Sequence, residues 1–233
     1  LRNTSQAVHT NRKLHTNTIA SYWSAFLGTL HAAHRDRKIK ENPCPYLERV
    51  KTIPTDRVGL SAEELIQLAE TPCDVPILRT AFLFSCLTGL RKSDVKPFSW
   101  ELIQPEADGT LYITDRMQKT DQIVHNPIGE EALALIDDGI REGIVFRGFK
   151  DSMTQAPLKR WVKAAGITKH ITYHSSRHTF CSLQLHAGTD VNTVKELVGH
   201  KNISTTQQYL DSVDSRKKDA ANRITIKRKE EHP

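Results

Sequence analysis

The sequence predicts a mainly α-helical protein with one small antiparallel β-sheet. Three observations lead to this prediction. Apolar residues recur at spacings of three and four along most of the 233 residues, which is the period of an amphipathic helix. A single stretch alternates apolar and polar residues in the manner of a β-hairpin. A polar segment rich in proline separates a shorter N-terminal part from a longer C-terminal part, which predicts two domains.

The first predicted element is an amphipathic helix from Thr18 to about Lys38. Its apolar face consists of residues three or four positions apart, namely Ile19, Tyr22, Trp23, Phe26, Leu30 and Ala33. The segment that follows, ENPCPYLERVKTIPTDR, contains three prolines in a polar setting and is typical of a linker. We therefore place the domain boundary near Arg57, with 1–57 as the first domain and 58–233 as the second.

Two helices with clear end signals open the second domain. Ser61 and Glu64 have the spacing of a capping box at the start of the first helix. The second helix is longer and more apolar. It begins at Pro76, a residue favoured in the first helical turn, and ends at Gly89, a residue favoured just after a helix.

A predicted β-hairpin lies in the stretch GTLYITDRMQKTDQIVHNPI. Leu111 and Ile113 alternate with polar residues before the turn. Apolar residues resume after it at Ile123 and Val124, and Lys119 lies near the tip.

Helical patterns then continue to the end of the chain, at 130–138, 152–165, 174–187, 190–199 and 205–218. Ser204 and Gln207 have the spacing of a second capping box. This spacing predicts that Tyr209 lies in the first turns of the last helix.

The net charge of +6 is carried by the first domain. Residues 1–57 contain ten Lys or Arg against four Asp or Glu, so the remaining residues balance. A basic domain suits a polyanionic partner such as DNA, because neutralising phosphates drives non-specific DNA binding. A solvated basic surface explains the charge alone equally well. We expect the DNA-contacting residues of this domain to be Arg35, Arg37, Lys38, Lys40 and Lys51.

Several classes of protein are disfavoured by the sequence. The four cysteines lie far apart without CxxC spacing, and no HExxH pattern accompanies the eleven histidines, so neither a disulfide framework nor a metal site is predicted. No run approaches the roughly 20 apolar residues of a membrane span, and no signal peptide is indicated. We expect a soluble cytoplasmic protein, and the start at Leu1 suggests a fragment of a longer one.

Residues suited to chemistry on a DNA phosphodiester are concentrated between His174 and Tyr209. Displacing one ester oxygen builds negative charge on the non-bridging oxygens, needs a deprotonated nucleophile and leaves an alkoxide that needs a proton. Arginine suits the first need because its guanidinium matches phosphate bidentately. A tyrosine hydroxyl beside a base suits the second. Lysine and histidine can move the protons. Taken singly, each such residue is more often a surface charge or a packing group.

The order and spacing of these residues resemble the tyrosine recombinases, the phage-integrase family. The matching stretches are TGLRKSDVKPFSW (88–100), QKT (118–120), HSSRHTF (174–180) and LVGHKNISTTQQY (197–209). By this resemblance the six catalytic positions of the family fall on Arg91, Lys119, His174, Arg177, His200 and Tyr209. Asp94 matches an acidic position that supports the arginines, although an acid favoured by the helix dipole explains it equally well. Pro97 departs from the pattern, since it falls where the helix after Arg91 normally continues.

The resemblance implies an integrase-like catalytic domain at 58–233, preceded at 1–57 by the closing part of a helical core-binding domain. Tyr209 would form a 3′-phosphotyrosyl link and free a 5′ hydroxyl, with neither metal nor ATP required. The implied partners are double-stranded DNA at specific sites, further copies of the chain in a synaptic tetramer, and accessory DNA-bending proteins. No membrane partner is implied, and the protein would work at the nucleoid.

Integration or excision of a mobile element is the function that these features favour. Two alternatives stay open at this point. A type IB topoisomerase-like enzyme would share the chemistry and relax supercoils without pairing two sites. A non-catalytic DNA-binding regulator would keep the fold alone.

Overall fold

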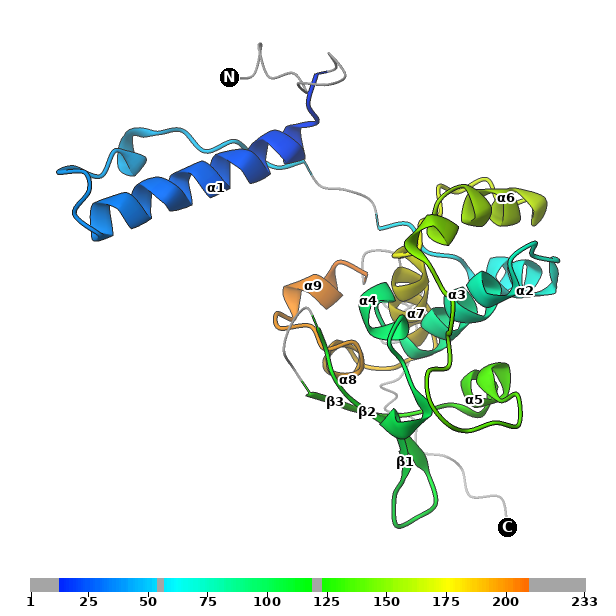
Figure 1. Ribbon diagram of the computed structural model, residues 1–233. Helices are drawn as coiled ribbons and strands as arrows, with labels where there is room; N and C mark the ends of the chain where they lie inside the picture. Colours follow the sequence, from blue (N-terminus) through cyan, green and yellow to red (C-terminus); the bar gives the residue numbers. More distant parts are fainter. Residues whose placement is uncertain (1–12, 54–56, 119–122, 210–233) are drawn as a thin grey trace, which may run out of the picture. The chain divides into compact units, whose positions relative to one another are not determined.

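The computed structural model describes residues 13–53, 57–118 and 123–209 (Figure 1). The chain divides into two compact units, 1–56 and 57–233. Within the described residues, no helix is both long and apolar enough to cross a membrane.

The first unit is built on α1 (Thr16–Arg35), with a short 3-10 helix at Cys44–Tyr46. After the 3-10 helix the chain runs back along α1, and side chains of α1 hold this segment by hydrogen bonds at two places. The Asn17 side chain exchanges two hydrogen bonds of 2.8 Å with the backbone of Ile53, and Trp23 Nε1 donates to Glu48 O at 2.9 Å. In the described part of this unit, the predicted apolar face is only partly covered, since Tyr22 and Phe26 are 65% and 50% exposed.

Helix α1 ends earlier than the sequence pattern predicts. Arg37 adopts a left-handed conformation with φ of 55°. Its N–H donates to His34 O at 3.0 Å, and the next N–H, of Lys38, donates to Ala33 O at 2.8 Å. These two bonds form a Schellman motif, which closes the helix without the glycine that usually marks this position.

The second unit contains most of the helices and the sheet. In chain order its elements are α2 (Ala62–Glu70), α3 (Pro76–Thr88), α4 (Lys92–Val95), a 3-10 helix (Trp100–Leu102), β1 (Ile103–Pro105), β2 (Leu111–Arg116), β3 (Ile123–Pro127), α5 (Glu130–Ile136), a 3-10 helix (Asp151–Thr154), α6 (Ala156–Ala164), α7 (Ser175–His186), α8 (Val191–Leu197) and α9 (Ser204–Gln207). Helix α4 stops two residues before Pro97, as the departure from the family pattern predicts.

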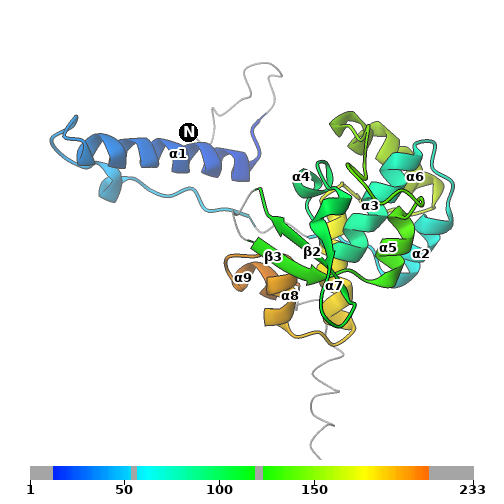
Figure 2. The ribbon, with the colours of Figure 1, turned by 60° about the horizontal axis from the view of Figure 1, so that its bottom comes forward.

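The core of the second unit surrounds α3, which packs against α7 and α5 (Figures 1 and 2). Phe82 of α3 meets Trp161 and Tyr173 edge to face, at 5.9 and 5.7 Å between ring centroids. The Tyr173 hydroxyl donates to Ala81 O at 2.8 Å. Since Tyr173 lies two residues before Ser175, the first residue of α7, this bond fixes where α7 begins relative to α3.

The three-stranded antiparallel sheet has the order β1-β2-β3, with Ile113 of β2 opposite Ile103 of β1 and Asn126 of β3. The predicted hairpin is therefore confirmed for β2 and β3, whereas β1 is too short to give a pattern in the sequence. Strand β3 lies beside α8 (Figure 2), where Asn126 Nδ2 donates to Leu197 O at 2.6 Å.

Two predicted helix ends are confirmed and one capping prediction is wrong. The Ser61 and Glu64 capping box is present, with bonds of 3.2 and 2.7 Å, and Gly89 ends α3 with φ of 71°. Ser204 makes no cap, because Ile203 O accepts the first N–H groups of α9 and Ser204 already lies inside the helix. Tyr209 consequently follows α9 instead of lying within it.

Candidate active site

Arg177 is a buried arginine in the first turn of α7, with 2% of its surface exposed. Its Nη1 donates to Gly89 O at 2.8 Å, and its Nη2 donates to Val198 O. Because Gly89 ends α3 and Val198 ends α8, one guanidinium joins the ends of two helices. Burial, helped by the neighbouring Arg91, lowers the pKa of Arg177 to about 10, so the group stays charged at neutral pH.

Arg91 lies at the start of α4 and is half-buried. Its Nη2 donates to Gly199 O at a long 3.5 Å. Its Nη1 is buried and has no hydrogen-bond partner among the described residues. Burial lowers the pKa of Arg91, and the attraction of Asp94 opposes that shift. A buried cationic N–H without an acceptor is unfavourable, so this atom is suited to an anionic ligand.

Asp94 is fully buried and ties two parts of the site together. Its carboxylate accepts the N–H of Arg91 at 3.3 Å and the N–H of Gln118 at 3.2 Å. The first bond places the acid in the first turn of α4, and the second fixes the end of the hairpin strand that precedes Lys119. Lys119 itself lies outside the described residues.

The turn at 198–200 delivers three groups to the site. The carbonyls of Val198 and Gly199 accept from Arg177 and Arg91, respectively. His200 Nδ1 lies 2.8 Å from Thr206 Oγ1. Burial and then the positive charge of Arg177 lower the pKa of His200 to about 3, which makes the imidazole neutral at pH 7.

Tyr209 is 5% exposed and packs in a small apolar cluster between α7, α8 and α9. Its hydroxyl lies 2.5 Å from His178 Nδ1 and accepts from Arg57 Nη1 at 3.1 Å. The Arg57 guanidinium also lies over the tyrosine ring, 5.3 Å from its centroid. Burial raises the pKa of Tyr209 to about 12, although Arg57 and Arg177 both act to lower it.

The structure brings five of the six predicted catalytic residues to one site. His174 is exposed at the start of α7, with its ring edge-to-face against His178 at 4.6 Å. The charges of Arg177, Arg91 and His174 all depress the pKa of His200. Tyr209 in turn affects the pKa of Arg177. Arg91, His174, Arg177, His200 and Tyr209 therefore lie close enough to interact electrostatically.

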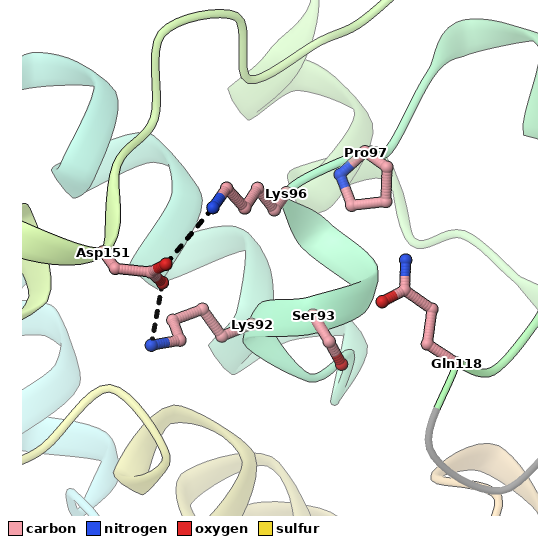
Figure 3. A pocket seen from close by; sticks show the side chains of 6 residues that line it. All are labelled: Lys92, Ser93, Lys96, Pro97, Gln118 and Asp151. Atoms are coloured by element: carbon pink, nitrogen blue, oxygen red, sulfur yellow. Dashed lines mark hydrogen bonds and ion pairs between the residues drawn. The ribbon is translucent and has the colours of Figure 1, made fainter.

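Two hollows flank α4 beside this site. The first has a volume of about 520 Å³ and is lined by basic residues that include Arg91, Lys159 and His174. The second, of about 620 Å³, is shown in Figure 3 and shares Lys92 with the first. The described residues contain no group of three His, Cys, Asp or Glu arranged to hold a metal ion.

A model of the Phage integrase family matches residues 60–216, which is more than half of the 233-residue chain. The chain belongs to the phage integrase family. All six predicted catalytic residues of this integrase-family chain fall inside the matched range.

Relatives and solved structures agree with this membership. Tyrosine recombinase XerC of Xanthomonas campestris pv. campestris is 29% identical over 164 residues, which cover 64% of this chain and 50% of the relative. XerC of Syntrophus aciditrophicus is 28% identical, covering 85% of this chain and 70% of the relative. The chain thus spans about half the length of the Xanthomonas protein. A lambda integrase dimer bound to a COC′ core site has a similar fold, with a TM-score of 0.66 at 20% identity over 91% of this chain and 78% of that one. The predicted fold class is confirmed.

The residues that the sequence predicts as DNA contacts of the first unit are all exposed: Arg35, Arg37, Lys38, Lys40 and Lys51. Arg35 pairs with the adjacent Asp36 at 3.1 Å. Their role in the integrase-family chain stays a prediction.

From the sequence, His178 is expected to have only a structural role, and Arg57 is not indicated as a site residue at all. His178 lies four residues after His174 in the same helix, and this spacing places both rings on one helical face, which is a usable signal. Arg57 gives no such signal, because its contact with Tyr209 spans 152 positions. Leu60 N donates to Thr179 Oγ1 at 2.9 Å, which holds the start of the second unit against α7.

Proposed function

We propose that this chain is the DNA-cleaving part of a site-specific recombinase that works through a covalent 3′-phosphotyrosyl intermediate. The observation that carries the proposal is the pair of arginines. Arg91 Nη1 is a buried donor without a partner in the described residues, close to the buried charge of Arg177. A non-bridging phosphate oxygen supplies the acceptor that Arg91 Nη1 lacks, next to the charge of Arg177.

In the proposed reaction the Tyr209 oxygen attacks phosphorus and the bond from phosphorus to the 5′ oxygen breaks. Arg91 and Arg177 stabilise the charge on the non-bridging oxygens. Neutral His200 holds the phosphate by a hydrogen bond, and Lys119 gives a proton to the departing 5′ oxygen. The energy of the broken ester is kept in the phosphotyrosyl bond, so a 5′ hydroxyl from a second strand can reverse the reaction without ATP.

The wider assignment follows the family. We propose that 1–57 closes a helical DNA-binding domain, that cleavage occurs in a tetramer of copies on paired DNA sites at the nucleoid, and that the parent protein integrates or excises a mobile element. The relative named XerC and the lambda integrase dimer on a core site support a recombinase acting on DNA.

The first test is the trapping of Tyr209 on DNA. A pool of nicked duplexes, with randomised sequence on both sides of the nick, prevents religation and accumulates the covalent adduct. We expect Tyr209→Phe to form no adduct resistant to denaturation, because it lacks the attacking oxygen and keeps the packed ring. Tyr46→Phe, at a tyrosine that is 89% exposed, is the matched control and should behave as the unaltered chain.

Sequencing the trapped DNA gives a site for the next measurement. Strand exchange between two copies of that site identifies a recombinase, whereas relaxation of supercoils alone would identify a topoisomerase. DNA binding with no adduct from the unaltered chain would contradict the proposal and favour a regulator.

A second expected result concerns DNA affinity at the hollow in Figure 3. Lys92 and Lys96 both point toward Asp151 there, with Nζ to carboxylate distances of 3.0 and 3.2 Å. All three side chains are substantially exposed, so a DNA phosphate in this hollow competes with Asp151 for the two ammonium groups. We propose that these lysines contact the DNA backbone beside the cleaved phosphate.

Asp151→Asn should therefore tighten binding of duplex DNA roughly fivefold at low salt, since it removes a negative charge that repels the DNA phosphates. Fluorescence anisotropy over a salt series measures this, and the gain should fade as salt rises. Asp74→Asn makes the same charge change at an exposed carboxylate 3.9 Å from Arg160 and serves as control. If both variants gain the same DNA affinity, the effect comes from net charge alone. That result would contradict the proposed contact of Lys92 and Lys96 with DNA.

A further inference from the structure

His178 is a histidine that contacts the reactive oxygen of the proposed mechanism. It lies in α7, four residues after His174, and its Nδ1 is 2.5 Å from Tyr209 Oη. The corresponding contact of His200 is with Thr206. Of the hydrogen bonds described for His178 and His200, the one to the nucleophile is therefore made by the histidine outside the set of six.

The direction of this hydrogen bond is constrained by another partner of the hydroxyl. Arg57 Nη1 lies 3.1 Å from the same oxygen, and a guanidinium has donors only. The Tyr209 oxygen thus accepts from Arg57, while its own proton can point to His178. Of these two partners, only the imidazole can take a proton.

We propose that His178 takes the phenolic proton of Tyr209 as the tyrosine oxygen bonds to phosphorus, an inference that rests on the proposed function. The O–H bond breaks, the O–P bond forms and the proton moves to Nδ1. The bond from phosphorus to the 5′ oxygen breaks, and that oxygen takes its proton from a different group. On religation His178 returns the proton to Tyr209, so the histidine is regenerated.

The surroundings of His178 keep its imidazole able to accept a proton. Burial, then the positive groups His174, Arg57 and Arg177, lower the pKa of His178 to about 4, so the imidazole is neutral at neutral pH, and its Nδ1 can accept a proton when the ring N–H is on Nε2. Cys181 is a further hydrogen-bond partner of the hydroxyl, and burial raises the pKa of its thiol to about 11, so it stays protonated.

These same charges explain why the tyrosine would be inert without DNA. With Tyr209 at a pKa of about 12 and His178 at about 4, transfer in the free chain is strongly uphill. A bound phosphate offsets the cations around His178, and bonding to phosphorus makes the phenol more acidic. Proton transfer is then favourable only when the substrate is in place.

The exposed ring of His174 meets that of His178 edge-to-face at 4.6 Å. Exchange of the captured proton with solvent is therefore expected on this side of the site. The buried side is closed by the apolar cluster around Tyr209.

The test compares His178→Asn with His178→Ala on two forms of the trapped nicked site. Asparagine keeps an acceptor close to the Nδ1 position but is not basic at neutral pH, whereas alanine removes both properties. The second form of the site carries sulfur in place of the bridging 5′ oxygen, and this leaving group departs without a proton.

We expect both variants to lose about 100-fold in the rate of adduct formation at neutral pH, on the oxygen and on the sulfur substrate alike. The variant rates should rise about tenfold per pH unit, since solvent must then remove a proton from a phenol with a pKa of about 12. His186→Asn changes an exposed histidine at the end of the same helix and should match the unaltered chain.

Three results would overturn the inference. Full activity of the asparagine variant would make His178 a positioning residue only. Recovery of the variants on the sulfur substrate would assign His178 to the leaving oxygen. If the unaltered chain and both variants form the adduct at the same rate, His178 is not the base, and the proposed function still stands. If the unaltered chain forms no adduct, the proposed function fails together with this inference.

Discussion

Replacing Arg177 by alanine is expected to abolish DNA cleavage and to destabilise the second unit. The guanidinium is 2% exposed and donates to Gly89 O and Val198 O. Its removal leaves a cavity and two carbonyls without their donor, which together cost about 2–4 kcal/mol of unfolding free energy. Loss of a donor to the charged phosphate should lower the cleavage rate at least 100- to 1,000-fold.

Arg177→Lys separates the two effects. Lysine keeps the charge but cannot reach both carbonyls with one planar group, so we expect most of the fold and little of the cleavage to survive. Adduct formation on the nicked site, denaturant unfolding and a gel shift measure the three properties. Arg160→Ala removes an exposed arginine and should change none of them. A variant at position 177 that cleaves normally, or that loses cleavage only in proportion to DNA binding, would contradict a catalytic role.

Gly89→Ala is expected to destabilise the second unit strongly, although it adds a single methyl group. Gly89 has φ of 71°, and an added Cβ would lie 2.6 Å from Phe180 Cδ1 and 3.0 Å from Val198 Cγ1. The left-handed backbone costs a non-glycine residue about 1 kcal/mol, and displacing packed side chains adds about 1–3 kcal/mol. We expect a loss of about 3 kcal/mol in denaturant unfolding. Cleavage should also fall, because the carbonyl that holds Arg177 moves.

Gly166→Ala is the matched control for this change. Gly166 has the same φ of 71°, and its added Cβ would meet only Gln67 Nε2, at an ordinary 3.6 Å. It should therefore lose about 1 kcal/mol through backbone strain alone. If the two alanine variants unfold at the same denaturant concentration, the close packing of Phe180 and Val198 against Gly89 is not the cause that we infer.

The parts of the fold that the sequence predicts are those whose signals are local. Ser61 and Glu64 close a capping box within one turn, and Gly89 ends α3 because only glycine adopts its φ cheaply in that packing. The hairpin is equally visible, since each side alternates over several residues. A local sequence signal misleads where a different group makes the hydrogen bonds that the signal predicts. Ile203 O takes the role expected of Ser204, and the Schellman bonds at Arg37 end α1 without glycine.

The site residues also divide into those with a local sequence signal and those without one. The resemblance of four short motifs to one family indicates Arg91, Arg177, His200 and Tyr209, and the structure gathers them. The resemblance does not indicate which residues hold these side chains in position. Arg57 reaches Tyr209 across 152 positions, and no periodicity or motif links the two residues. Contacts of this kind depend on how α7 packs against the start of the second unit, which only tertiary structure supplies.

The neighbouring carbonyls of Val198 and Gly199 bind one arginine each. These two carbonyls belong to consecutive planar peptide units that meet at Gly199, so the two positive charges are held by one short turn after α8. Thermal motion that tilts α8 would carry both guanidinium groups in the same direction and change their separation far less than their position. A tetrahedral anion would then meet the same pair of charges even while the helices around it fluctuate.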